Sequence, residues 1–482
     1  MKRSSRVLTL VLLASFAHRG MAQGVKGAAL DRSKAPRIGV APTFTVPTWT
    51  IDTLSNGVRL VVVEKHDLPI VSLSIHFNGG ADQLGTKLGV TGFLGAMLRE
   101  GTTSRSADQL NNDLALLGTA VSFGVGNENG SAGFSSLSRT FDQTAAIMMD
   151  MMLHSTFPAA SLERLRTQSL AAYARGQDVV GQIAAQITPA LLYGNQPYGK
   201  VANDADLKAV TRDDVANLAK QFFVPVNATA YIVGDMTRAQ AKSKLESAFK
   251  VWPASGIKLA VTYPTAPMPA PTTIYLVDMP NKPQSELVLS RTIVPEYSPD
   301  MAKVDVMNAI MGGMFQSRLN SNIREVHGYS YGFNSRTFWL KGPGSQRAQG
   351  AVTREKTDSS LIEAMKEIRG MTGGIPVTAD ELTAAKNSLT LSLPSRVQSV
   401  GGISSVVSRI VDEHLPKDWW AQYIAAVNAT TSTDVADATK KYMDPDHLVI
   451  LIVGDGAKIA DAVKATGIAP IVKLDKTGQK LP

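Results

Sequence analysis

The sequence predicts an α+β fold built from one domain that occurs twice. The tetrapeptide Ile-Val-Gly-Asp ends a strand-like segment at residues 232–235 and again at 452–455, a spacing of 220 residues. In both halves, strand-like segments come first and blocks of helical periodicity follow. A repeat of this length indicates a duplicated domain and not a solenoid. Strands followed by blocks of helices favour an antiparallel sheet covered by helices, so we expect two homologous α/β-sandwich domains.

The first domain is expected over residues 49–252. It opens with two strands across an Asn-Gly turn at residues 56–57, the dipeptide typical of a tight hairpin. Residues 71–77 alternate apolar and polar side chains with period two, as a half-buried strand does. The remaining elements follow in chain order: helices at 85–100 and 110–117, strand-like residues 118–137, helices at 141–153 and 159–176, a polar helix from 212, and a strand at 228–235.

The second domain is expected over residues 272–465, after a stiff linker at 253–271 that contains five prolines. The same order of elements returns in this half, and residues 466–482 form a tail. The expected elements are strands at 273–277 and 286–290, a helix from 301, helices at 356–370, 378–391 and 403–414, and a strand at 448–455.

The N-terminus predicts export. Residues 1–23 place three basic residues before a short apolar run, and small residues then precede a cleavage point after Ala22, which is the pattern of a cleavable signal peptide. The alternative is an uncleaved N-terminal anchor. Residues 24–48 are polar and rich in proline and form an extended lead-in. We therefore expect a periplasmic or secreted protein, with no transmembrane segment once the signal is removed.

Charge and composition exclude several classes of protein. The hydrophobic content of 44% is too high for a disordered chain, and the absence of cysteine excludes disulfides and thiolate sites. The net charge of +8 includes four basic residues of the signal peptide, so the mature chain carries +4. This ordinary balance gives no reason to expect nucleic acid as a partner.

Several motifs resemble the pitrilysin/insulinase metallopeptidases. The clearest is the segment Gly-Val-Thr-Gly-Phe-Leu-Gly-Ala-Met-Leu-Arg-Glu-Gly-Thr at residues 89–102, which is similar to the helix of the family's inverted zinc motif. Residues 192–198, residues 211–215 and both Val-Gly-Asp endings add to the likeness, which covers residues 49–465. The resemblance implies homologous domains that close as a clamshell around an extended peptide.

The residues that would bind zinc are missing. The family's His-x-x-Glu-His motif places two imidazoles and a glutamate on one helical face. The corresponding positions here are Gly92, Gly95 and Ala96, and the distal glutamate falls at Ala172. None of these side chains can bind a metal or move a proton, so the resemblance implies a degenerate site with no catalytic residue. The glycine pair has two readings, drift after loss of catalysis or a close-packed neighbour.

The histidines offer no replacement site. The tripeptide at residues 412–414 looks like the end of an inverted motif, but the position of its first histidine is occupied by Ile410. We therefore interpret His414 as a polar residue near a helix end and predict no metal site and no cofactor in this chain.

A substrate-binding pair is carried over from the family. The segment at residues 317–331 resembles the family's second-domain motif, in which an arginine and a tyrosine seven residues later hold the peptide near the scissile bond. These are Arg324 and Tyr331 here, with Gly328 between them. The alternative reading is a helix-end arginine and a half-buried strand tyrosine. Residues 118–126 match the family's edge strand, which receives substrate by β-augmentation, or else form an ordinary strand weakened by glycines.

The resemblance therefore implies a non-catalytic, substrate-binding subunit of an exported heterodimeric zinc peptidase. Zinc and the general base would come from a zinc-bearing homologous partner, and Arg324 and Tyr331 would complete that partner's site around an extended peptide substrate. The alternative is an inactive peptide-binding or structural scaffold that acts as a homodimer. A stand-alone peptidase with unrecognised chemistry is the weakest of the three hypotheses.

Overall fold

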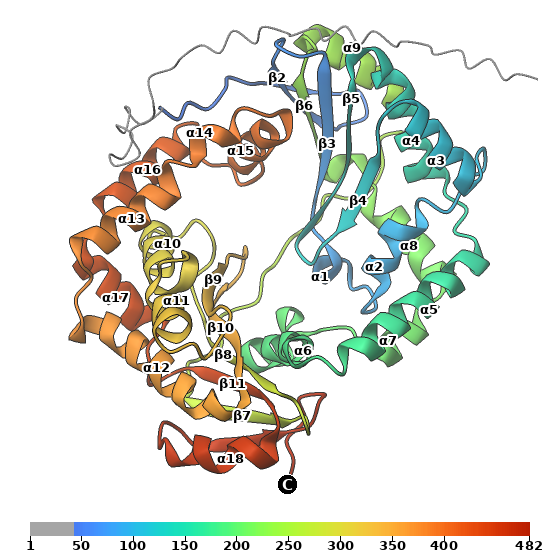
Figure 1. Cartoon of the computed structure of the whole chain (residues 1–482). Helices are drawn as coiled ribbons and strands as arrows, with labels where there is room; N and C mark the ends of the chain where they lie inside the picture. The colour runs from blue at the N-terminus through green and yellow to red at the C-terminus, as the bar shows by residue number, and fades with distance from the viewer. Residues whose placement is uncertain (1–42) are drawn as a thin grey trace, which may run out of the picture. The chain divides into compact units, whose positions relative to one another are not determined.

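Two six-stranded sheets organise residues 43–482, the part of the chain that the computed structural model describes (Figure 1). The predicted signal peptide and residues 24–42 of the lead-in lie outside the described residues. Each sheet is covered by helices, so the predicted α+β class is confirmed. The first sheet contains β1 (Thr50–Thr53), β2 (Arg59–Glu64), β3 (Ile70–Asn78), β4 (Val121–Val125), β5 (Asn129–Leu137) and β6 (Ala228–Gly234). The second contains β7 (Thr273–Asp278), β8 (Gln284–Thr292), β9 (Asn334–Phe338), β10 (Ser345–Thr353), β11 (Val449–Gly454) and β12 (Ile471–Leu474).

The two sheets share one topology. Their strand orders are β1-β2-β6-β3-β5-β4 and β12-β7-β11-β8-β10-β9, so five strands correspond one to one. The two Val-Gly-Asp segments end the central strands β6 and β11. The outermost strand differs between the sheets, because β1 precedes β2 in the chain whereas β12 follows all the other strands. Residues 466–482 were expected to form a tail, but they contribute β12 to the second sheet.

The sheets are mixed, which corrects the expectation of wholly antiparallel sheets. Strand β6 runs parallel to β2, and β11 runs parallel to β7, while the other shared pairings are antiparallel. The long stretch of chain between β2 and β6, which contains three strands and several helices, makes this possible, since a parallel neighbour needs a crossover of a dozen or more residues.

Nine helices belong to each half of the described residues. In the first half they are α1 (Ala81–Leu84), α2 (Val90–Met97), α3 (Ala107–Leu116), α4 (Phe141–His154), α5 (Ala159–Gly176), α6 (Val180–Tyr193), α7 (Asp204–Ala209), α8 (Arg212–Phe222) and α9 (Arg238–Ala248). In the second half they are α10 (Met301–Asn308), α11 (Arg318–Asn320), α12 (Thr357–Arg369), α13 (Ala379–Thr390), α14 (Leu393–Arg396), α15 (Val400–Asp412), α16 (Trp419–Ala429), α17 (Ser432–Tyr442) and α18 (Gly456–Ala465). Two π-helical turns, Ala309–Gly313 and Ser321–Val326, flank α11.

Local capping explains where the corresponding helices α8 and α17 begin. Each starts after a threonine whose hydroxyl accepts the backbone N–H of an aspartate three residues later, and the aspartate side chain accepts the N–H of the threonine. The pairs are Thr211 with Asp214 and Thr431 with Asp434. This reciprocal arrangement satisfies two of the N–H groups that a helix start leaves free.

Each sheet buries one face under helices of its own half, which forms two large apolar cores. The opposite face is covered by a helix from the other half. Helix α6 packs Ile183 and Ile187 against Val288 and Leu451 of the second sheet. Helix α15 packs its own apolar side onto the first sheet. The residues in that contact are Ile403, Val407 and Val411 on the helix and Val61, Val63, Tyr231 and Val233 on the sheet.

The two halves therefore exchange one helix each. Helices α6 and α15 occupy corresponding places in the duplicated sequence, and each completes the core of the other copy. No element was predicted over residues 180–193 from the sequence, although Ile183, Ile187 and Leu191 recur at helical spacing. None of the helices within residues 43–482 is long and apolar enough to cross a bilayer.

Candidate functional site

The three motif positions Gly92, Gly95 and Ala96 lie on α2, as the sequence predicts for this segment. The buried side of α2 consists of apolar side chains, among them Phe93 and Leu94. Ala172 lies on α5, which packs against α2. None of the four side chains carries a group that can bind a metal ion. Within residues 43–482, moreover, no three His, Cys, Asp or Glu side chains gather as metal ligands.

The two glycines of α2 differ in their surroundings. A Cβ atom added at Gly95 would lie 3.0 Å from the Phe123 carbonyl oxygen of β4, which is tighter than an ordinary contact. A Cβ atom added at Gly92 would meet nothing within 4 Å. The close-packed reading therefore holds for Gly95, and its neighbour is the main chain of β4. The sequence could not identify this neighbour, because a main-chain contact has no side-chain signature.

Strand β4 is an edge strand, as the sequence predicted, and α2 closes part of that edge. The backbone N–H of Gly126 bonds the Asn129 carbonyl, so the alternation of an antiparallel pair turns the carbonyls of Val121 and Phe123 outward. The Arg99 guanidinium donates to the Val121 carbonyl at 2.7 Å. Since Gly95 lies against the Phe123 carbonyl, two outward carbonyls at this edge already have neighbours within the chain.

Arg324 lies in the π-helical turn Ser321–Val326, and its guanidinium carbon is 4.7 Å from the centre of the Phe315 ring. Gly328 ends the turn with a φ of +65°, a left-handed conformation that glycine adopts without strain. Its N–H bonds the Arg324 carbonyl, which is the 5→1 bond of the αL motif at a helix end, and the next N–H bonds the Ile323 carbonyl.

Tyr331 follows this turn and is 92% exposed. It lies outside the strands, so the alternative reading as a half-buried strand tyrosine is wrong. Within residues 43–482 its hydroxyl has no hydrogen-bond partner. Phe315 and Val326 are also exposed, by 63% and 75%. The segment 315–331 therefore presents aromatic, apolar and basic side chains to the outside of the chain.

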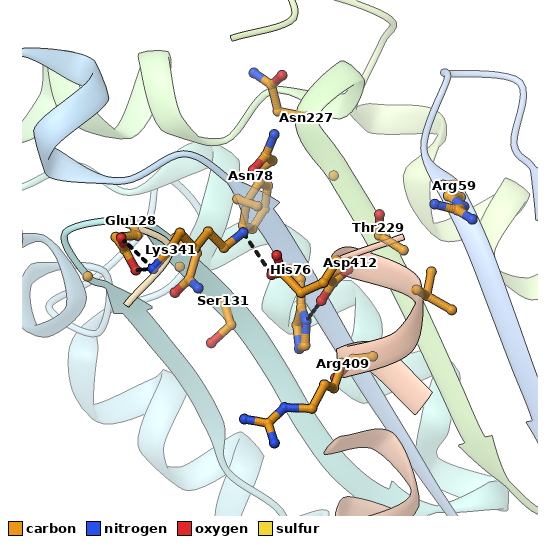
Figure 2. A pocket seen from close by; sticks show the side chains of 18 of the residues that line it. Arg59, His76, Asn78, Glu128, Ser131, Asn227, Thr229, Lys341, Arg409 and Asp412 are labelled. Carbon is orange, nitrogen blue, oxygen red and sulfur yellow. Dashed lines mark hydrogen bonds and ion pairs between the residues drawn. The ribbon is translucent and has the colours of Figure 1, made fainter. Parts of the chain in front are cut away.

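A cavity of about 830 Å³ lies elsewhere, between the first sheet and the second half. Its floor is the end of the first sheet nearest the start of β6, and its other walls come from α15 and from residues 296–297 and 339–341. Figure 2 shows His76 and Ser131 on the sheet, with Lys341 and Arg409 coming from the second half. Neither Arg324, Tyr331 nor the motif positions of α2 line this cavity.

Three pairs of acidic and basic side chains surround the cavity, and the first of them joins the two halves. His76 Nδ1 lies 2.7 Å from Asp412 Oδ2 at the end of α15. Lys341 Nζ lies 2.9 Å from Glu413 Oε1, and Arg409 lies 2.7 Å from a Glu296 oxygen. Burial raises the pKa of Glu296 above its usual range.

Tyr231 adds a further bond to this junction, because its hydroxyl donates to the second oxygen of Asp412. Burial, together with the nearby Asp412 carboxylate, raises the pKa of Tyr231, so the phenol stays protonated. Sequence reasoning missed this junction. His76 was visible at a polar position of an alternating strand, and Asp412 was considered only as part of a zinc motif.

Comparison with known proteins finds relatives among the M16 peptidases. Residues 209–389 match the model of the peptidase M16 inactive domain. A non-peptidase homologue, YmxG of Helicobacter pylori, is 21% identical over 406 residues, which are 83% of this chain and 93% of that protein.

Solved structures share the fold. A peptidase M16 inactive domain from Pseudomonas fluorescens superposes with a TM-score of 0.77 at 23% identity, over 84% of this chain and 98% of that one. The periplasmic protease PqqL of Escherichia coli superposes with a TM-score of 0.71 at 16% identity, over 90% of this chain and 49% of that one. Taken together, these matches show that the chain is similar to inactive homologues of the M16 peptidases and shares their fold.

Proposed function

We propose that this chain is the non-catalytic, substrate-binding subunit of an exported M16 zinc peptidase heterodimer. The zinc ion and the general-base glutamate belong to a homologous partner chain. This chain supplies Arg324 and Tyr331, which hold an extended peptide in the partner's site. The observation that carries the proposal is the 92% exposure of Tyr331 beside a turn whose arginine is also accessible.

The chemistry of the pair suits this role. A guanidinium and a phenol are both hydrogen-bond donors that can hold a peptide carbonyl. When a carbonyl is attacked by water, negative charge develops on its oxygen, and positioned donors stabilise that charge. Arg324 keeps its place over Phe315, while Tyr331 makes no competing bond within residues 43–482. Tyr331 is therefore available to a molecule outside the chain, and Arg324 is partly exposed with one ion pair to the neighbouring Glu325 at 3.4 Å.

The test is reconstitution. The purified chain is mixed with a zinc-bearing M16 homologue from the same organism, and cleavage of a peptide library is followed. We expect cleavage only in the mixture. Arg324→Ala or Tyr331→Phe should lower kcat by about 100-fold, since one oxyanion donor contributes 10²–10³ in rate. Arg139→Ala, an exposed arginine outside the segment 315–331, is the matched control and should leave the rate unchanged.

Two outcomes contradict the proposal. Cleavage that ignores both substitutions rejects the role of Arg324 and Tyr331. A stable homodimer that neither binds the zinc-bearing homologue nor supports cleavage favours the structural scaffold instead. Light scattering on the isolated chain and on the mixture distinguishes these assemblies.

Export is part of the proposal. Its support is the signal-like sequence of residues 1–23 and the likeness to a periplasmic protease. N-terminal sequencing of the protein from a periplasmic extract should give a chain that begins at Gln23. Recovery of the full-length chain with the membranes would show that residues 1–23 act as an anchor.

A further inference from the structure

The floor of the 830 Å³ cavity is a polar face of the first sheet. Arg59 is in register with Thr229, Thr229 with His76, and His76 with Ser131, so these four residues form one row across β2, β6, β3 and β5. Residues in register on neighbouring strands project from the same face of a sheet. The adjoining row contains Asn78 and Asn129, and all of these side chains line the cavity. Figure 2 shows Arg59, Thr229, His76, Ser131 and Asn78 among them.

The cavity exists because α15 ends early. The next rows along the same face, which include Val61 and Tyr231, are covered by α15. This helix ends at Asp412, and the left-handed φ of +53° at His414 follows its end. The polar rows beyond Asp412 are therefore not covered by this helix.

In the second half, the place that corresponds to this cavity is largely filled by apolar side chains. The residue that corresponds to Thr229 is Val449, as their pairings with β2 and β7 show. Val449 packs under Leu192, Tyr193 and Tyr198, which continue from the end of α6. The two halves have the same topology, but the second half has a pocket of only about 90 Å³ beside Val449, where the first has the polar cavity of about 830 Å³. This difference indicates a binding site and not a defect of packing.

Two basic side chains of the lining have no acidic partner in the described part of the chain, whereas every acidic side chain of the lining has a hydrogen-bond partner. Glu296, Asp412 and Glu413 are each bound to a basic side chain of the cavity wall. Glu128 accepts the backbone N–H groups of residues 341 and 342 and the Tyr198 hydroxyl. By contrast, Arg59 and Lys258 make no ion pair with any carboxylate of residues 43–482. Within these residues, Arg59 and Lys258 are therefore the two cationic side chains of the lining that are free to bind an anionic group.

We propose that this cavity binds the carboxyl end of a short peptide, with Arg59 as the carboxylate ligand. A guanidinium fits a carboxylate with two parallel hydrogen bonds. The amides of Asn78 and Asn129 both donate and accept, as the alternating N–H and C=O groups of a peptide require. A volume of about 830 Å³ lies within the range of small-ligand sites. The rings of Tyr297 and Trp339 on the opposite wall offer an apolar surface for a side chain of the peptide.

This site is separate from the role proposed for Arg324 and Tyr331. It uses residues of both halves of one chain and needs neither zinc nor a partner, so it is tested on the isolated protein. Failure of reconstitution leaves this proposal standing, and failure of the present test leaves the heterodimer proposal standing.

The experiment compares free carboxylates with carboxamides. Mixtures of N-acetylated tri- to pentapeptides, one set with a free carboxyl end and one set amidated, are equilibrated with the protein by dialysis and measured by mass spectrometry. We expect peptides of the free-acid set to be retained about tenfold or more over their amides, which is the size expected for a charge-assisted hydrogen bond. Equal retention of both sets, or retention of neither, overturns the proposal.

Variants assign the binding to the cavity. Arg59→Gln should abolish the preference for the free acid, and Asn78→Asp, at an exposed position of the floor, should weaken it by repelling the carboxylate. Arg139→Gln removes an exposed arginine outside the cavity and should change nothing. If Arg59→Gln and Asn78→Asp both keep the preference, the carboxylate binds elsewhere and the assignment to this cavity is wrong.

Discussion

His76 and Asp412 join the two halves of the chain, with 2.7 Å between Nδ1 of the histidine and Oδ2 of the aspartate. The histidine lies on β3 of the first half, and the aspartate ends the exchanged helix α15 of the second half. Tyr231, on β6, donates to the other oxygen of Asp412, and its ring centre lies 4.8 Å from that of His76. One carboxylate therefore anchors the end of α15 to two neighbouring strands of the sheet that it covers.

Asp412→Asn should destabilise the folded chain. The substitution removes the charge and leaves one acceptor oxygen where the junction needs two. We expect the free energy of unfolding to fall by about 1.5–3 kcal/mol, the range for hydrogen bonds to a charged group. Urea denaturation followed by circular dichroism measures the change. Asp461→Asn, at an exposed position of α18, is the matched control, and an equal effect in both variants would contradict a special role for Asp412.

The exchanged helix α6 also covers an acidic residue. Glu286 on β8 is 8% exposed, and a Cβ atom added at Gly181 of α6 would lie 3.5 Å from its Oε2 atom. Burial raises the pKa of Glu286 to about 7 from an ordinary value of 4.5. In the folded chain this carboxyl keeps its proton up to about neutral pH, whereas in the unfolded chain it loses the proton near pH 4.5.

Glu286→Gln should therefore change the pH dependence of stability. Between the two pKa values the folded state binds more protons than the unfolded state, so this group lowers the stability as the pH rises from about 4.5 to about 7. At pH 8 the variant should be more stable than the original chain by about 2–3 kcal/mol, and near pH 4.5 the two should be nearly equal. Denaturation curves at both pH values test this. Parallel pH profiles for the two proteins would show that Glu286 does not titrate in this range.

The exposure of Tyr331 predicts that its removal has little effect on the stability of the fold. Because its side chain is 92% exposed, Tyr331→Ala should change the free energy of unfolding by no more than about 0.5 kcal/mol. The buried Tyr231 provides the contrast, since Tyr231→Phe removes a donor to Asp412 and should cost about 1–2 kcal/mol. A large loss of stability in Tyr331→Ala would mean that Tyr331 supports the fold and is not free for a ligand.

Local patterns predicted the strands and the duplication well. Strand β3 follows from alternation of period two, and the central strands β6 and β11 follow from the repeated Val-Gly-Asp endings. The edge position of β4 followed from the resemblance to a known family. In each case the signal lies within a short segment, and burial of one face of a sheet imposes that signal on the sequence.

Contacts between the halves had no such signal. Residues 76 and 412 are 336 positions apart, and nothing near either of them encodes the other. Helix α6 was not predicted from the sequence. The surface that this helix covers belongs to the other half, so its packing partner could not be read from nearby residues. The cavity could not be predicted for the same reason. It depends on where α15 ends relative to a polar row of the first sheet, which is a relation between two domains.

The two glycines of α2 provide the last prediction, because they share a helix and differ in what lies next to them. Replacing a helical glycine by alanine stabilises a helix by about 0.5–1 kcal/mol where there is room for the methyl group. Gly92 has that room, so Gly92→Ala should raise the free energy of unfolding by this amount. At Gly95 the methyl group would press on the Phe123 carbonyl of β4 at 3.0 Å, so Gly95→Ala should gain nothing or lose stability.

Urea denaturation of the two variants side by side measures the difference. Equal stabilisation by both would mean that α2 can move away from β4 at no cost, and that both glycines reflect drift after the loss of catalysis.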